Sequence, residues 1–475
     1  QSVMAEGGIN AALNTKDEND SPEEHFTDTI KAACGLADPN AVWGMTQAAP
    51  ELVHWLLKLG VKFNMSGYDD VDLRNFGGQK KKRTAFAQSD TGKQIMTAMI
   101  DAVRRKEASG MVERFSHHSF LTLRLCGNIC CGCVIRDEYS QEIVELPGNA
   151  VIVASGGMHG LFGNTTGSLS NTGEVTAELF RLGVPLANGE MIQYHPTTVE
   201  CGGKRMLISE AARGEGGRLF ALRNNQPWYF MEEKYPELGN LMPRDITARE
   251  IWKVSHESEV FLDMTEISKE VISNKLSGLA DDCMTYLHKD IRKEPVPVLP
   301  GIHYFMGGIL VDEQHRTSIQ NLYAAGECCA QYHGANRLGG NSLLGALYGG
   351  RVAAKSACEQ ADGVVLSCAA QIDIPPVQEI VGTKQLNQAM QDSLGVVRNG
   401  NSLLKGIRKV QELKGTLPLL GLAVLQSAFA RKESRGAHWR EDYPECNNRD
   451  FLKTTVARFD GKQIQISFMS VPERR

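Results

Sequence analysis

The chain has 475 residues, of which 42% are hydrophobic, and its formal net charge is −5. At roughly 100–200 residues per domain, this length predicts two to four domains with enough apolar side chains for a large core. The weakly negative charge argues against nucleic acid or an anionic membrane surface as a partner. No apolar run reaches the roughly 18 residues that indicate a membrane-spanning helix.

Twelve cysteines in a chain of this length do not indicate a disulfide scaffold. Four of them gather at Cys126, Cys130, Cys131 and Cys133, with a spacing that fits no standard zinc or iron–sulfur pattern. Between two apolar runs, Gly127-Asn128 is a turn dipeptide. We therefore predict a β-hairpin with cysteines at its small strand positions, and no metal site.

Local patterns predict helices and strands along the first half of the chain. Asp38-Pro39 opens a helix that ends at Leu59 before Gly60, and Thr91-Gly92 opens another that runs to about 105. Three strands follow, at 111–115, 121–125 and 131–136. The runs at 150–157 and 321–327 are apolar on both faces and end at glycine, which is typical of buried strands in a parallel sheet.

A glycine-rich turn precedes the next helix. Asn341-Ser342 predicts the cap of a helix from Leu343 to Ala357, and Gly339-Gly340 comes directly before it. The free N–H groups at such a helix start can bind an anion. Small residues at three- and four-residue spacing along it let a backbone or a flat ligand come close, and close helix packing is the simpler alternative.

The amino-acid composition of the sequence changes at about residue 190 and again after residue 360. Residues 190–310 hold short helices and more Trp, Glu, Lys and Arg, which indicates a domain inserted between two parts of one sheet domain. Pro375-Pro376 and its polar surroundings predict a linker. Amphipathic helices follow at 384–433, and Asp460-Gly461 predicts a hairpin within 459–468.

Five clusters of Arg, His and Glu lie beside glycine or proline turns, at 193–197, 209–217, 243–245, 303–308 and 334–340. A lone histidine is usually a core residue and a lone arginine an ion-pair partner, but sites concentrate on loops of this kind. Together the clusters offer two imidazoles and up to three guanidiniums. That set suits a small dianion, because arginine binds carboxylates bidentately and stays charged.

These clusters carry a resemblance that extends over nearly the whole chain. The sequence resembles the flavoprotein subunits of succinate dehydrogenases and fumarate reductases, with L-aspartate oxidase as a close relative. The matching segments are, in order, Ala5–Gly8, Phe76–Gly78, Arg83–Ala87, Ala154–Gly157, Gln193–Thr197, Glu210–Gly217, Arg244-Asp245, His303–Gly308, Gly326-Glu327, His333–Leu343 and Ser434–Pro444.

The resemblance implies an α/β fold with four parts. A Rossmann-like FAD-binding domain is expected at 1–189 and 301–360, with an inserted α+β capping domain at 190–300. A C-terminal helical bundle is expected at 361–438, and a small tail domain at 439–475.

The resemblance also implies an FAD-dependent enzyme that interconverts fumarate and succinate. A hydride would pass to or from flavin N5, with Arg244 as the proton donor and Glu210 and Arg213 as the relay that returns its proton. The residues expected to bind the dicarboxylate are Phe76, His195, Leu207, Ser209, Glu210, His303 and Arg337. Those expected to contact FAD are Gly7, Gly8, Ala154, Ser155, Gly156, Gly157, Glu174, Glu327, Ser342 and Leu343.

The start of the sequence departs from the family pattern. No G-x-G-x-x-G precedes Ala5, so the βαβ unit that cradles the FAD pyrophosphate is expected outside this chain, and FAD affinity is expected to be weak without it. Gln1 aligns with the histidine to which membrane-bound members attach FAD, so we expect noncovalent FAD. The stretch Thr172-Gly173-Glu174-Val175 also departs from the family pattern, because relatives usually have Asp and Gly at the positions of Glu174 and Val175.

Two alternatives remain open from the sequence. L-aspartate oxidase is one, although oxidases tend to have cysteine at the position of Met306. A non-catalytic remnant or subunit that lost its nucleotide site is the other. The resemblance implies an iron–sulfur electron-transfer subunit as a partner, because the chain has no cluster motif of its own. We expect a cytoplasmic protein, attached to a membrane only through such a partner.

Overall fold

The computed structural model describes residues 2–67, 70–168, 170–361, 370–375 and 380–475. Its first part holds η1 (Ser2–Met4), β1 (Ile9–Asn10), α1 (Pro22–Ala32), α2 (Pro39–Leu59), β2 (Leu73–Arg74), β3 (Thr84–Ala85) and α3 (Thr91–Ala108). The prediction for α2 is confirmed at both ends. The Asp38 side chain accepts hydrogen bonds from the first N–H groups, and Gly60 ends the helix in the left-handed region at φ 100°.

The cysteine-rich segment forms the predicted hairpin. β4 (His118–Cys126) and β5 (Ile129–Asp137) pair antiparallel, and β6 (Ile143–Pro147) pairs with β5. The predicted strand at 111–115 is wrong, because these residues are irregular. Met111 instead bonds back to the Lys106 carbonyl at the end of α3, and its side chain is 71% exposed. No neighbouring strand is available to pair with it in the described chain.

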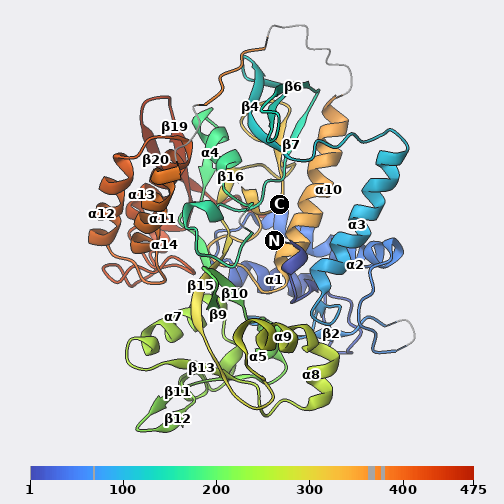
Figure 1. Cartoon of the computed structure of the whole chain (residues 1–475), viewed down its shortest axis with the longest axis vertical. Helices are drawn as coiled ribbons and strands as arrows, with labels where there is room; N and C mark the ends of the chain where they lie inside the picture. Colours follow the sequence, from blue (N-terminus) through green and yellow to red (C-terminus); the bar gives the residue numbers. More distant parts are fainter. Residues whose placement is uncertain (1, 68–69, 169, 362–369, 376–379) are drawn as a thin grey trace.

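Two short strands form the parallel pair that the sequence predicts. β7 (Val151–Val153) pairs with β17 (Leu322–Ala324), and α10 (Asn341–Ala361) packs against both strands (Figure 1). The helix starts two residues before the predicted Leu343. The Asn341 side chain is held by Asn10 and His25, so its backbone joins the helix rather than only capping it.

The middle of the chain contains two antiparallel sheets. β9 (Ile192–Cys201) lies between β10 (Lys204–Leu207) and β15 (Leu299–Phe305). The second sheet has the order β12-β11-β13-β14, formed by β11 (Arg218–Arg223), β12 (Gln226–Trp228), β13 (Val260–Asp263) and β14 (Val296–Pro297). Its helices are α5 (Glu210–Gly214), α6 (Phe230–Lys234), α7 (Arg244–Ser255), α8 (Lys269–Lys275) and α9 (Ser277–Asp282), followed by a π-helical turn (Cys283–Leu287).

The second sheet and its helices have a hydrophobic core of their own, and they lie at the bottom of the view in Figure 1. That separate core supports the inserted capping domain, whose bounds of 190–300 stay a prediction. After β15 the chain continues through β16 (Gly308–Leu310), the strand β17 described above, η5 (Gly326–Cys328) and β18 (Cys329–Ala330).

The C-terminal part is a helical bundle joined to a hairpin. α11 (Ile380–Ser393), α12 (Gly400–Gln411) and α13 (Thr416–Ala430) share one core with η2 (His159–Leu161) and α4 (Glu174–Arg181). After α14 (Asn448–Phe451), the predicted hairpin is confirmed as β19 (Lys453–Phe459) and β20 (Ile464–Ser470). β19 also pairs with β8 (Leu186–Ala187), so the tail extends an earlier sheet. Most of the predicted linker, including Pro376, lies outside the described residues.

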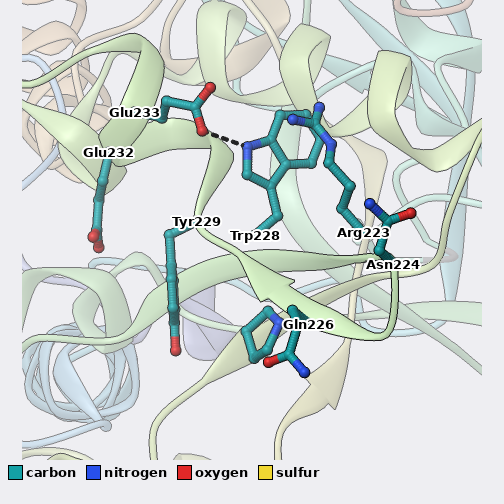
Figure 2. A pocket seen from close by; sticks show the side chains of 8 residues that line it. Arg223, Asn224, Gln226, Trp228, Tyr229, Glu232 and Glu233 are labelled. Carbon is teal, nitrogen blue, oxygen red and sulfur yellow. Dashed lines mark hydrogen bonds between the residues drawn. The ribbon is translucent and has the colours of Figure 1, made fainter.

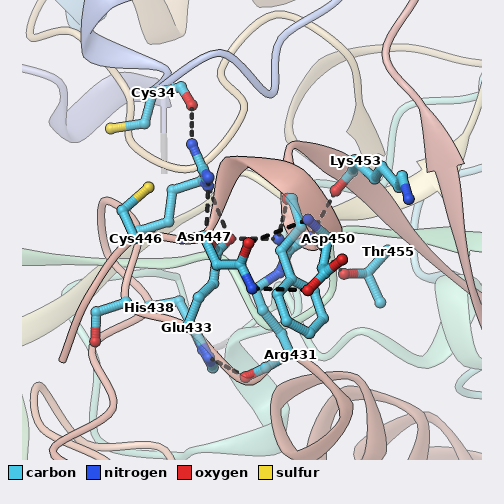
Figure 3. Close-up of polar contacts among 12 residues, drawn as sticks. Cys34, Arg431, Glu433, His438, Cys446, Asn447, Asp450, Lys453 and Thr455 are labelled. Carbon is cyan, nitrogen blue, oxygen red and sulfur yellow. Dashed lines mark hydrogen bonds and ion pairs between the residues drawn. The ribbon is translucent and has the colours of Figure 1, made fainter. Parts of the chain in front are cut away.

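A buried ionic network fastens this part to the rest (Figure 3). Arg431, at the end of α13, contacts Glu190 at 2.7 Å and Glu433 at 2.8 Å, and donates to the Lys453 carbonyl and the Thr455 hydroxyl of β19. Arg435 contacts Glu433 at 2.7 Å. Glu190 comes two residues before β9, so the network connects the bundle to a strand that carries site residues. No helix in the described part of the chain is long and apolar enough to cross a membrane.

Candidate functional site

A cavity of about 810 Å³ lies where the capping elements meet β7, η5 and α10. Its walls come from segments that are far apart in the sequence, from residue 2 to residue 350. Sixteen residues named from the sequence line it: Gly7, Gly8, Phe76, Ala154, Ser155, Gly156, His195, Leu207, Ser209, Glu210, Arg244, His303, Glu327, Arg337, Ser342 and Leu343. The fold thus brings both groups of predicted residues, those for dicarboxylate and those for FAD, to one cavity.

Three predicted residues do not line the cavity. Arg213 is fully buried behind Glu210. Gly157 lies beneath Glu327, where an added Cβ would come within 2.7 Å of the carboxylate. Glu174 is exposed in the first turn of α4, where its carboxylate contacts the Thr172 hydroxyl. Gln1 lies outside the described residues.

Glu210 is held between two arginines. Its Oε2 accepts from Nε and Nη2 of Arg244 at 2.8 and 2.6 Å, and its Oε1 accepts from Arg213 Nη2 at 3.2 Å. Ser209 caps α5, so Glu210 opens that helix, and Pro243 precedes Arg244 at the start of α7. Burial alone raises the pKa of Glu210, but the charges of Arg244 and Arg213 offset it and leave the pKa below its usual value. The carboxylate is therefore ionised at neutral pH.

Two imidazoles lie side by side in the cavity, with ring centroids of His195 and His303 5.1 Å apart. Burial, followed by the charge of Arg244, lowers the pKa of both rings well below the ordinary value, so both are neutral at pH 7. His195 Nδ1 lies 3.0 Å from the Thr197 carbonyl oxygen and 3.3 Å from its N–H, and Nε2 has no protein partner among the described residues. The unpartnered nitrogen is buried, where an unmet polar atom is costly.

Arg337 supplies a further cation. It is fully buried, its guanidinium lies 4.4 Å from the Tyr304 ring centroid, and its Nε has no partner in the described chain. Burial, and then repulsion from Arg244, lowers its pKa to about 9, so it stays charged at neutral pH. An anionic ligand would relieve both the unmet donor and the repulsion.

Gln193 and Asn336 were not assigned roles from the sequence, although the resemblance includes both positions. Gln193 Oε1 accepts from Arg244 Nη1 at 3.1 Å, while its amide donates to the Arg337 carbonyl and to Asn336 Oδ1. Asn336 in turn donates to Asp245 at 2.9 Å. These amides join α7 of the capping elements to the loop that carries Arg337, and so hold the two arginines in register.

Glu6 is a further residue that the sequence reasoning missed. It lines the cavity, and burial followed by repulsion from Asp282 raises its pKa to about 8. It is therefore mostly neutral at pH 7 and does not repel a dianion there. Its place directly before Gly7-Gly8 was the available signal.

The cavity wall fits a flavin. At Gly8, whose φ is +131°, an added Cβ would come within 2.5 Å of the Ala85 carbonyl oxygen. At Gly7 it would come equally close to the Phe76 ring, so glycine is required at both positions for the chain to pack against these neighbours while it lines the cavity. The first turn of α10 lines the cavity, and the buried Ser155 hydroxyl has no protein partner within the described ranges. Both offer polar contacts to a cofactor.

A second cavity, of about 580 Å³, lies on the surface beside the β11–β12 hairpin (Figure 2). Polar side chains that line this cavity make contacts with one another. Arg223 stacks on Trp228 at 3.3 Å, and Trp228 Nε1 donates to Glu233 at 2.7 Å. None of the residues predicted from the sequence lies there, so the larger cavity is the candidate site.

Comparisons with known proteins identify relatives of the whole chain. A family model described as an FAD binding domain matches residues 1–343, and one described as the fumarate reductase flavoprotein C-terminus matches 415–474. A succinate dehydrogenase flavoprotein subunit of Bacillus subtilis is 38% identical, over 100% of this chain and 92% of its own length. An L-aspartate oxidase of Caulobacter vibrioides is 33% identical, over 93% of this chain and 86% of its own.

Among solved structures, a chain of E. coli quinol fumarate reductase superposes with a TM-score of 0.89 at 27% identity. The match covers 99% of this chain and 90% of that one.

Proposed function

Because the chain belongs to the family of succinate dehydrogenase and fumarate reductase flavoproteins, we propose that it interconverts succinate and fumarate in this cavity. The family consists of FAD-dependent oxidoreductases that act on the CH–CH bond of these dicarboxylates. One observation carries the proposal for this chain. The buried carboxylate of Glu210 bridges two guanidiniums, one of which, Arg244, lines the same cavity as the residues predicted to contact FAD.

The dicarboxylate would be bound by His195, His303 and Arg337. Arg337 is a buried cation with an unmet N–H, and His195 has a buried unmet nitrogen. One carboxylate would meet Arg337 and the other the histidines, with the Phe76 ring and Leu207 covering the carbon chain. Ser209 would contribute its hydroxyl at the end of the site.

Arg244 would move the proton. When bound, FAD supplies the two-electron chemistry by exchanging a hydride with one substrate carbon. Arg244 would give its proton to the other carbon during reduction, or take one during oxidation. Because Glu210 is ionised at rest, it would take up a replacement proton from solvent through Arg213 on Oε1 and pass it from Oε2, 2.6 Å from Nη2, to Arg244; oxidation would run the same transfers in reverse. Such a relay is needed because an arginine holds its proton at ordinary pH.

Glu327, Ser155 and the start of α10 would hold the cofactor, which we propose is bound noncovalently. The electron partner would be an iron–sulfur subunit, as the family resemblance implies. Both the reducing and the oxidising direction fit this geometry, because the same residues serve each in reverse.

Turnover assays of the FAD-loaded protein test the proposal. We expect oxidation of reduced viologen with fumarate, reduction of a dye with succinate, and no hydrogen peroxide from L-aspartate. Aspartate-dependent peroxide without fumarate or succinate turnover would assign the chain to L-aspartate oxidase instead. If the FAD-loaded protein turns over none of the three, the chain is a non-catalytic member and the proposal fails.

A further inference from the structure

Two consecutive threonines on one loop each contact a different histidine. Thr165 Oγ1 lies 3.0 Å from His159 Nδ1, and Thr166 Oγ1 lies 2.8 Å from His303 Nδ1. Thr166 lines the cavity beside His303. His159 faces the cofactor side instead, because its Nε2 lies 3.4 Å from Glu327.

The loop is fixed by its backbone. The Thr166 N–H donates to the Ile302 carbonyl of β15 at 3.0 Å, and the Arg205 N–H of β10 donates to the Thr165 carbonyl at 3.4 Å. Gly167 packs so closely on the His159 ring that a Cβ there would overlap it. The loop backbone therefore places Thr166 beside His303, with its hydroxyl 2.8 Å from Nδ1.

That hydroxyl can decide which nitrogen of His303 carries the proton. A neutral imidazole has one donor and one acceptor, and the partner of one nitrogen sets the role of the other. No other partner of Thr166 Oγ1 is found in the described chain, so its hydroxyl is free to donate to Nδ1. The ring proton then lies on Nε2, for which the described residues provide no partner.

The neighbouring imidazole has mixed contacts at Nδ1. The Thr197 carbonyl oxygen, which can only accept, lies 3.0 Å from His195 Nδ1, while the Thr197 N–H donates to the same nitrogen at 3.3 Å and the Thr197 hydroxyl lies 3.4 Å away. These contacts favour neither tautomer of His195, whereas the hydroxyl partner of His303 can favour one.

We propose that Thr166 is a positioning residue, whose hydroxyl keeps the proton of His303 on Nε2 so that the ring donates to a substrate carboxylate. The inference rests on the proposed function for its substrate. The charged groups around the His303 ring are Arg244 from α7 and Arg337 from its loop, with the imidazoles of His195 and His159 nearby. Because these cations disfavour a protonated imidazole, the tautomer decides whether His303 can donate at all.

Substitutions at Thr166 test this in the FAD-loaded protein. Thr166→Val keeps the branched shape and removes the hydroxyl, and Thr166→Ser keeps the hydroxyl. We expect Thr166→Val to raise the KM for fumarate or succinate about five- to thirty-fold, the effect of one lost hydrogen bond. We expect kcat to change less, and Thr166→Ser to restore the KM to within about twofold. Thr46→Val, which removes a buried hydroxyl from α2 away from the cavity, should leave the KM unchanged.

A spectrum of ¹⁵N-labelled histidine provides a readout that needs no substrate, with His303 assigned by its loss in His303→Gln. We expect a neutral ring protonated at Nε2 in the native protein and in Thr166→Ser, and a shift towards the other tautomer in Thr166→Val. An unchanged His303 signal in Thr166→Val, or an unchanged KM, would overturn the inference. Absence of dicarboxylate turnover in the native protein would instead count against the proposed function, while the spectrum would still decide the role of Thr166.

Discussion

At the scale of single residues, Arg244 has an electrostatic role and a hydrogen-bonding role, and a substitution can separate them. Its charge balances Glu210, and its N–H groups face the cavity. Arg244→Lys keeps the charge but loses the paired contacts at 2.8 and 2.6 Å. We expect kcat to fall roughly 10²- to 10⁴-fold, the range that loss of a positioned acid or base gives. The KM should change less than tenfold, as measured by steady-state turnover of fumarate.

Arg249→Lys is the matched control for that variant. It lies on the same helix, and its guanidinium stacks on Trp439 at 4.0 Å, away from the cavity. It should retain nearly full kcat. If Arg244→Lys retained it too, Arg244 would not be the proton donor.

His195 gives a prediction for pH. Its pKa in the free protein is well below 6.5, and two substrate carboxylates would raise it by favouring the charged ring. Between these two values the complex binds one more proton than the free protein, so affinity should rise up to tenfold for each unit that pH falls. Calorimetric titration with succinate across pH 5–9 measures this dependence of the affinity on pH. His195→Gln should flatten this dependence, and an identical slope in both proteins would contradict the assignment.

At the scale of elements, the Arg431 network decides how the bundle joins the rest. Arg431→Met would leave Glu190 and Glu433 buried without their shared cation. Breaking such a buried pair typically costs about 3–5 kcal/mol, so we expect the urea unfolding midpoint to fall strongly. Adding Glu190→Gln should recover part of the loss, because Glu190 is the carboxylate left without an ion pair, while Glu433 keeps its contact with Arg435.

Arg458→Met is the control for this element. Arg458 lies on β19 near the Arg431 contacts but is exposed to solvent. Its loss should move the unfolding midpoint little. A similar small effect from Arg431→Met would mean that the network contributes little to stability.

Element ends were largely predictable because the signals that set them are local. The Asp38 cap, Pro39 and Gly60 fix α2 whatever surrounds it. The strand predicted at 111–115 failed because a strand also needs a partner, and none lies beside those residues in the described chain. α10 began before its predicted start because Asn10 and His25, more than 300 residues away in sequence, hold the Asn341 side chain.

At the scale of the whole molecule, a dicarboxylate would bridge the two sides of the cavity. His195 and Arg244 come from the capping side, while Arg337 precedes α10. A ligand that binds only the folded protein stabilises it by about 2.7 kcal/mol at a hundred times its dissociation constant. We expect succinate to raise the melting temperature of the FAD-loaded protein by several degrees, in a thermal scan where acetate at equal concentration has little effect.

Arg337→Met should remove most of that shift, because its cation is the contact on the far side of the cavity. An equal rise with acetate would indicate a general anion effect rather than a two-carboxylate site.

The sequence by itself determined the kinds of chemistry available. Its motifs named the carboxylate between two arginines, the two histidines and the glycine turns, because each depends on residue type and local spacing. Only the tertiary structure decided which of them share one cavity, and it left Arg213, Gly157 and Glu174 off the wall. It also decided the raised pKa of Glu6, the bridge through Gln193 and the place of Thr166. Burial and partners from distant segments set these properties, and no short stretch of sequence contains them.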